Sequence, residues 1–220
     1  MYLWAFGILG LVAVVLAQQN NRWNCSRVGN STFERYCIIA NLIDLPAPRE
    51  VLEVNYTSNT TVNEGNKLSL EQVQSKPSSV QWPVDEGQFY TLIKTDSDSS
   101  SERSTINHWL LVNIPGVNFT LNITAGDEIV EYLGANPPKN TGLHRYVFLA
   151  YRQVDLLNAT ELSKQYSSSN RANFQIKKFA LENGIGNPVA GNFYLAQSSS
   201  AHLMLATFSL ALGSLFCTLF

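Results

Sequence analysis

Residues 136–152 read NPPKNTGLHRYVFLAYR, and this stretch decides the class of fold that the chain is expected to adopt. From Tyr146 to Tyr151 every side chain is apolar or aromatic, so both faces of an extended segment would be hydrophobic. A strand with two hydrophobic faces lies at the centre of a sheet and is covered on each side. The sequence therefore predicts a central strand at residues 144–152.

A second stretch, Trp109 to Val112, is apolar on both faces in the same way and predicts another central strand. Further short segments are rich in β-branched and aromatic residues and are bounded by Gly, Pro, Asn or Ser. The strands expected from these patterns are residues 51–56, 79–82, 89–95, 108–114, 128–133, 144–152 and 189–195.

Helical patterns are few. Residues 33–42 and 171–182 have the apolar spacing of short amphipathic helices, and residues 69–73 predict one or two helical turns. Serine clusters at residues 99–101, 167–169 and 198–200 are expected to form loops or a stalk. Many strands, few helices and no strand–helix alternation predict a mainly β fold, an antiparallel β-sandwich with small peripheral helices.

Both ends of the chain look like processing signals. Residues 1–17 form an uncharged apolar run that ends at Ala17 before a polar stretch, which predicts a secretory signal peptide; an uncleaved anchor is the alternative. Residues 198–220 are a serine stretch followed by an apolar run to the last residue. This pattern favours a glycosylphosphatidylinositol attachment signal, with a retained transmembrane helix as the alternative. Residues 18–197 then form one domain.

The mature chain is expected to be glycosylated and to carry one disulfide. Seven Asn-x-Ser/Thr sequons agree with a secretory route, and they begin at Asn24, Asn30, Asn55, Asn59, Asn118, Asn122 and Asn158. Cys25 and Cys37 would remain after processing and could form a bridge in an oxidising compartment, or stay as two unpaired thiols. With 15 Lys and Arg against 17 Asp and Glu, and no basic run, nucleic acid is not an expected partner.

Polar side chains at the ends of the buried strands could form a small pocket. Asp96 and Asp98 follow the strand at residues 89–95, and an extended chain would point both carboxylates to one face. His108 opens one apolar strand, and His144 opens the other together with Tyr146. Such groups could converge at the mouth of the core. Alternatively, the aspartates cap a turn and the histidines are hydrogen-bonded structural groups.

Four segments resemble the phosphatidylethanolamine-binding protein family, also known as Raf kinase inhibitor proteins, in order and spacing. They read YTL at 90–92, HWLLVNI at 108–114, NPPKNTGLHRY at 136–146 and PVAGNFY at 188–194. The resemblance extends from about Asp44 to Gln197, and the block PPK-x-TGLHRY-V-F is its most specific part.

The resemblance implies a β-sandwich with a small anion pocket that takes phosphate or a phosphoethanolamine head group. It assigns this pocket to Asp96, His108, Pro137, His144 and Tyr146, with Asp98 at the second acidic position of the same loop. Imidazole N–H and phenol O–H groups suit a phosphate, and a carboxylate can orient an imidazole or meet an ammonium. Two histidines would make binding sensitive to pH near neutrality.

Several positions depart from the family pattern. Where the family's acidic loop usually reads D-P-D-A-P, this chain has DSDSS at residues 96–100, so the loop is expected to be more mobile. Ile106 and Asn107 replace the aromatic residue and the first histidine before His108, and Asn136 replaces the glycine before the two prolines.

The sequence thus predicts an extracellular binding protein at the outer cell surface, or secreted, and not an enzyme. Its expected partners are a phospholipid head group or similar anion and, through the C-terminal anchor, a membrane. The alternative function is inhibition of a protease, or another protein interaction, through the surface, because some members of the family inhibit serine proteases. No G-x-S-x-G elbow and no CxxC metal spacing is present, and no cofactor or metal is expected.

Overall fold

A computed structural model describes residue 23 and residues 29–101, 104–117, 120–121 and 123–198. The expected signal peptide, the C-terminal tail from residue 199, Cys25 and the sequons at Asn24, Asn118 and Asn122 lie outside these residues. Cys37 is buried, and its bridge to Cys25 stays a prediction. No helix within the described ranges is long and apolar enough to span a membrane.

The fold consists mainly of strands, as expected. The strands are β1 (Glu50–Val51), β2 (Glu53–Tyr56), β3 (Thr60–Thr61), β4 (Asn66–Lys67), β5 (Ser79–Gln81), β6 (Phe89–Ser101), β7 (Ser104–Val117), β8 (Thr120–Leu121), β9 (Asp127–Val130), β10 (His144–Gln153) and β11 (Ala190–Ala196). The helices are α2 (Thr32–Arg35), α3 (Ile38–Asn41), α4 (Ala159–Gln165) and α5 (Ile176–Glu182), with short 3₁₀ turns η1 (Glu71–Val73) and η2 (Ile123–Ala125).

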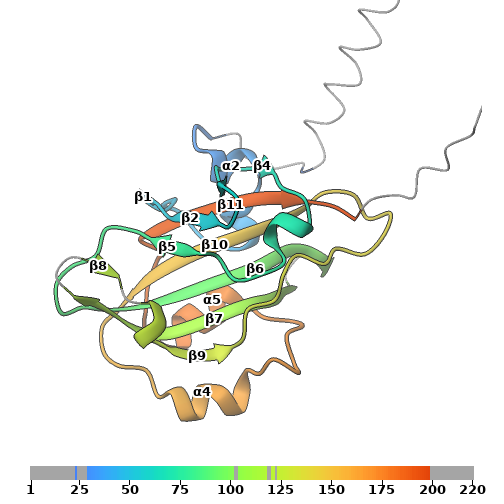
Figure 1. The fold of residues 1–220 in the computed structure, drawn as a ribbon. Coiled ribbons are helices and arrows are strands. Elements are labelled where there is room, and N and C mark those ends of the chain that lie inside the picture. Colours follow the sequence, from blue (N-terminus) through green and yellow to red (C-terminus); the bar gives the residue numbers. More distant parts are fainter. Residues whose placement is uncertain (1–22, 24–28, 102–103, 118–119, 122, 199–220) are drawn as a thin grey trace, which may run out of the picture.

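The strands form one large and one small sheet (Figure 1). The large sheet has the order β1-β11-β10-β6-β7-β8, with β4 paired to β11 and β9 paired to β7. Its pairs are antiparallel, except that β1 and β4 run parallel to β11. The small sheet has the order β3-β2-β5. The predicted β-sandwich with small helices is confirmed.

Strand β10 lies between β6 and β11 and has hydrophobic cover on both faces. Val147 and Leu149 belong to a buried cluster that includes residues of α2, α3, α4 and α5. Phe148 and Ala150 belong to a second cluster that includes residues of β2 and β5. The large sheet is therefore packed between helices on one face and the small sheet on the other, which confirms the central strand.

The N-terminal helical segment differs from the single helix expected at residues 33–42. Helix α2 begins with a capping box in which Ser31 and Glu34 satisfy each other's backbone N–H groups. Cys37 then adopts a left-handed conformation, with φ 53°, and separates α2 from α3. Because this conformation cannot continue a right-handed helix, the segment splits into two single turns.

The serines after Asp96 do not form the loop that the sequence predicts. Strand β6 continues to Ser101, which pairs with Ser104 of β7 across register shifts. Proline cannot donate a ladder hydrogen bond, whereas serine keeps its N–H. The absence of prolines at residues 97–101 therefore permits the β6–β7 hairpin to extend beyond the predicted end at Thr95.

Candidate functional site

The carboxylate of Asp96 and the imidazole of His144 form the centre of the site. His144 Nδ1 lies 2.9 Å from Asp96 Oδ2 and 3.1 Å from Oδ1. The two side chains are 1% and 3% exposed, and β6 and β10 hold them because Asp96 pairs with Tyr146 across the ladder. A carboxylate at this distance fixes the orientation of the ring.

The second nitrogen of His144 is held by the turn that leads into β10. Thr141 Oγ1 lies 2.7 Å from His144 Nε2 and 2.7 Å from the carbonyl oxygen of Pro138. The sequence NPPKNTGLH thus places a hydroxyl three residues before the histidine, within reach of its ring. Thr141 was not among the expected site residues.

His108 and Tyr146 lie beside each other, as the sequence analysis expected. Their rings contact edge to face, with centroids 5.2 Å apart. His108 Nδ1 lies 3.1 Å from the carbonyl oxygen of Leu133. Burial lowers the pKa of His108 to about 4, and the charge of Lys94 acts in the same direction. The expected pH sensitivity near neutrality therefore does not come from His108.

The hydroxyl of Tyr146 is buried and makes no hydrogen bond of normal geometry in the described part of the chain, although the Asp96 carboxylate and the backbone of Asn136 lie near it. Burial raises the pKa of this phenol, and the nearby Asp96 carboxylate raises it further. A buried hydroxyl without a partner costs free energy, typically about 1–3 kcal/mol. A ligand that accepts a hydrogen bond from Tyr146 would remove this cost.

Pro137 is buried at the edge of the same region, and its carbonyl oxygen accepts a hydrogen bond from Ser198. The structure thus brings Asp96, His108, His144 and Tyr146 together, with Pro137 in the loop that precedes β10. Asn136 next to it is exposed.

Asp98 does not share a face with Asp96, which corrects the expectation for the two carboxylates. It binds Arg145 of β10 in a bidentate pair, with Arg145 Nη2 2.8 Å from Oδ1 and Arg145 Nε 2.9 Å from Oδ2. Trp23 Nε1 donates to the same carboxylate, and Arg145 also donates to the carbonyl oxygen of Tyr36. The register shifts between Asp96 and Ser101 allow the two carboxylates to diverge. Asp98 therefore has a structural partner.

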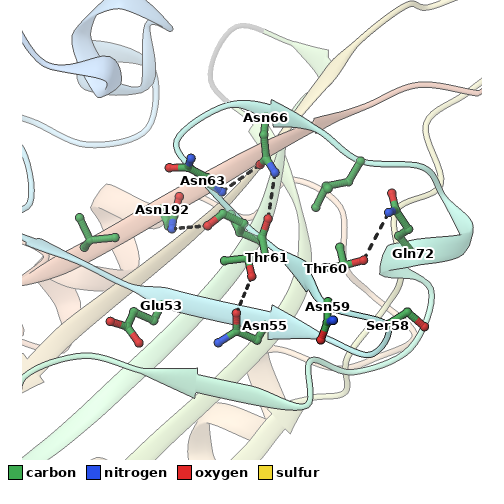
Figure 2. Close-up of a pocket in the computed structure, with 13 residues that line it drawn as sticks. Glu53, Asn55, Ser58, Asn59, Thr60, Thr61, Asn63, Asn66, Gln72 and Asn192 are labelled. Atoms are coloured by element: carbon green, nitrogen blue, oxygen red, sulfur yellow. Dashed lines mark hydrogen bonds between the residues drawn. The ribbon is translucent and has the colours of Figure 1, made fainter.

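A separate depression of about 650 Å³ lies between the β2–β3 hairpin, the β4 segment and β11. Figure 2 shows that its lining is rich in amides and hydroxyls, and Glu53 is the charged side chain among the lining residues. No cation lines this groove within the described residues, and the Glu53 carboxylate would repel a phosphate.

Two of the sequons lie in this groove and differ in accessibility (Figure 2). Asn55 is half-buried, its Nδ2 donates to Ser79 and its Oδ1 accepts from Thr61. Asn59 is exposed at the end of the hairpin, with φ 54°. Asn59 is therefore better placed than Asn55 to accept a glycan; Asn30 and Asn158 are also exposed.

Comparison with known proteins identifies relatives along most of the chain. The model of the family described as phosphatidylethanolamine-binding protein matches residues 47–194. The "Putative odorant-binding protein A5" of Drosophila melanogaster is 31% identical over 191 residues, which cover 84% of this chain and 86% of that protein. The "26 kDa secreted antigen" of Toxocara canis is 36% identical over 165 residues, which cover 73% of this chain and 61% of the antigen.

A solved structure supports the same assignment. It is described as carboxypeptidase Y inhibitor complexed with the cognate proteinase, and it is 25% identical to this chain with a TM-score of 0.64. The similarity covers 76% of this chain and 94% of the inhibitor chain. The chain belongs to the phosphatidylethanolamine-binding protein family.

Proposed function

We propose that the protein is an extracellular binding protein whose pocket takes phosphate-bearing head groups such as phosphoethanolamine. The pocket is formed by Asp96, His108, Pro137, His144 and Tyr146. The observation that carries the proposal is the buried, unpartnered hydroxyl of Tyr146 beside the buried Asp96–His144 pair. Trp82 Nε1, Asn107 Nδ2 and the Tyr194 hydroxyl also lack partners among the described residues, so the position of Tyr146 beside the Asp96–His144 pair is what points to a ligand.

The chemistry of the remaining groups agrees with a phosphate ligand. Phosphate oxygens accept hydrogen bonds, and the phenol of Tyr146 can donate one, whereas both ring nitrogens of His144 are already engaged by Asp96 and Thr141. Asp96 holds the His144 ring in place and can also meet the ammonium of an ethanolamine group. The pocket therefore offers the phenol of Tyr146 to the phosphate and one carboxylate to a cationic substituent.

A pair of tyrosine variants tests this binding role. Tyr146→Phe removes only the hydroxyl, and we expect it to weaken phosphoethanolamine binding roughly tenfold, the effect of one lost hydrogen bond. Tyr151→Phe is the matched control, because Tyr151 is equally buried in β10 but belongs to the cluster on the helical face. Equal affinities for the wild type and both variants would contradict a role for Tyr146 in the pocket.

We propose that the protein is not an enzyme. The relatives in the comparison are described as a binding protein, an antigen and an inhibitor. Incubation of the purified protein with phosphoester substrates should release no product above the buffer control. Turnover that His144→Ala removes would overturn this assignment.

We further propose that the chain is secreted, glycosylated at exposed sequons such as Asn30 and Asn59, and anchored through its C-terminal tail. The relative described as a secreted antigen supports secretion. Expression in cells with an intact secretory pathway should give a surface protein that phosphatidylinositol-specific phospholipase C releases. Treatment with a glycosidase should lower the apparent mass of this protein on a gel. Resistance to the phospholipase would favour a retained transmembrane helix. Mass spectrometry of the unreduced protein should find the Cys25–Cys37 bridge.

Inhibition of a protease is the second candidate function. The structural relative whose description names a carboxypeptidase inhibitor in complex with its proteinase favours it. Inhibition through the surface should survive Tyr146→Phe, because that hydroxyl is buried. Assays of serine proteases with the wild type and this variant distinguish the two roles.

A further inference from the structure

Lys94 of β6 is a lysine inside the core, two residues before Asp96. It is fully buried, with 0% exposure, on the face of the large sheet that packs against the small sheet. Its Nζ atom lies 4.0 Å from the ring centroid of Tyr132, and between 5.7 and 5.8 Å from those of Tyr146, Phe148 and Tyr194. Four aromatic rings therefore surround a potential cation directly behind Tyr146.

The hydrogen bonds of Lys94 connect it to the candidate pocket. Nζ donates to Tyr132 Oη at 2.9 Å and to the carbonyl oxygen of Leu133 at 2.8 Å. His108 Nδ1 lies 3.1 Å from the same Leu133 oxygen. The lysine nitrogen and the pocket histidine thus share one acceptor, so the charge of Lys94 acts on the pocket over a short distance.

Within the described part of the chain, the two acceptors of Lys94 Nζ match a neutral amine, which has two N–H groups, better than an ammonium, which has three. Tyr132 Oη also contacts Tyr56 Oη at 2.9 Å and donates to the carbonyl oxygen of Val73 at 2.8 Å, so it is fully used. Burial holds the pKa of Lys94 well below its ordinary value, while the Asp96 carboxylate opposes this shift and Arg171 adds to it. The ligand-free site therefore favours the uncharged lysine.

We propose that Lys94 is a specificity-determining residue that becomes a cation when an anion enters the pocket, and that it makes the pocket prefer dianionic phosphomonoesters to monoanionic phosphodiesters. This inference rests on the proposed phosphate-binding function. A dianion interacts with a buried positive charge more strongly than a monoanion does, and the interior screens this interaction less than water. The proton that Lys94 gains comes from solvent. The preferred ligands are inorganic phosphate and phosphoethanolamine rather than an intact phospholipid.

Other titratable or charged groups surround Lys94 and could also change their protonation when an anion binds. They are Asp96 on the same strand, His108 on β7, His144 and Tyr146 on β10, Tyr194 on β11, Tyr56 on β2, Tyr132 after β9, and Arg171. Burial raises the pKa values of the four phenols, so they stay neutral at physiological pH. Lys94 and His108, whose pKa values burial lowers, are therefore groups whose protonation can follow the ligand.

Binding measurements with three ligands test the role of Lys94 in the full-length protein. Calorimetry at about pH 8, where a phosphomonoester carries two charges, compares inorganic phosphate, phosphoethanolamine and the diester glycerophosphoethanolamine. We expect the wild type to bind the two monoesters at least about tenfold more tightly than the diester. Lys94→Met replaces the amine by an uncharged, unbranched side chain of similar length. It should reduce the preference for monoesters over the diester to about threefold or less. Lys178→Met removes an exposed charge from α5 and should keep the wild-type ratio.

The outcomes separate this inference from the proposed function. Binding by Lys94→Met with an unchanged monoester preference overturns the role of Lys94 alone, whereas a wild type that binds none of the three ligands overturns both. If Lys94→Met does not fold, the protonation state of Lys94 can instead be followed in the wild type by carbon-13 NMR of the lysine Cε signals. Phosphate should move the ring-shifted signal of the buried lysine from its neutral to its protonated position at constant pH. A signal that does not move contradicts the proposal.

Discussion

Thr141 controls the orientation of His144 through the ring nitrogen that Asp96 leaves available. Its hydroxyl lies 2.7 Å from His144 Nε2 and contributes nothing to the hydrophobic core. We expect Thr141→Val to weaken phosphoethanolamine binding by roughly tenfold while the melting temperature changes little, because ring orientation and not packing is lost. Calorimetry and thermal unfolding measure both quantities.

Thr141→Ser is the matched control for that substitution, since it keeps the hydroxyl. Binding by the serine variant should stay close to that of the wild type. If serine weakens binding as much as valine does, the effect comes from the shape of the turn and not from the hydroxyl.

His108 is expected to make the protein less stable in mild acid. Its pKa of about 4 in the folded state lies below the ordinary value of 6.5, so the unfolded chain takes up this proton first. The stability associated with His108 is complete above about pH 6.5 and falls as the pH decreases to about 4, by at most about 3 kcal/mol. His108→Gln should lose less stability over this window in denaturant unfolding at several pH values. Equal losses in both proteins would contradict the low pKa.

Four residues that the sequence assigned to a pocket lie together in the structure, whereas the residues that hold them in place were not predicted. Asp96, His108, His144 and Tyr146 stand at strand ends, where alternation indicates their face. Lys94 could not be found in this way, because a lysine near the end of a strand normally faces solvent and only the β6–β10 register buries it. Leu133 acts through its backbone, which carries no sequence signal.

At the scale of secondary structure, the Asp98–Arg145 pair connects the N-terminal helices to β10. Arg145 reaches the carbonyl oxygen of Tyr36 after α2, and its guanidinium lies 5.3 Å from the ring of Trp23. Burial raises the pKa of Asp98, but the hydrogen bonds and charge of Arg145 outweigh it and hold the pKa below its ordinary value. The pair therefore stays charged at neutral pH and fixes the N-terminal segment to the large sheet.

We expect Asp98→Asn to destabilise the protein by about 3 kcal/mol, because it leaves the nearly buried Arg145 without its carboxylate. Asp85→Asn is the matched control: Asp85 pairs with Arg152, and both side chains are more than half exposed, so its loss should cost about 0.5 kcal/mol or less. Denaturant unfolding measures both differences. A similar, small cost for the two variants would show that the Asp98 pair does not support the fold.

The long strands were predicted more reliably than the boundaries. The expected segments at 108–114 and 144–152 lie within β7 and β10, because apolar runs on both faces indicate central strands directly. Helix α4 was missed: Leu162 is its one buried residue, so it has no amphipathic pattern, and its start depends on the capping side chain of Asn158. The predicted helix at 171–182 begins only at Ile176, because Phe174 pairs as a bridge with Thr105.

In the molecule as a whole, the large sheet between two hydrophobic clusters keeps the candidate pocket at the ends of β6 and β10. The class of fold followed from the sequence, because many short strands with few helices leave few other ways to bury both faces. The order of the strands did not follow, since β1 and β4 join β11 in parallel through contacts far apart in the chain. The family resemblance, and not the pattern of residues, suggested the ligand that we propose for the pocket.

The account depends most on the claim that His144 belongs to a working phosphate pocket. Its most direct test is isothermal titration of the purified protein with phosphoethanolamine and with inorganic phosphate, for the wild type and for His144→Ala. We predict measurable binding by the wild type and none by the variant, with the folded state of the variant confirmed by circular dichroism. Absence of binding by the wild type, or an unchanged affinity in a folded His144→Ala protein, would contradict the account.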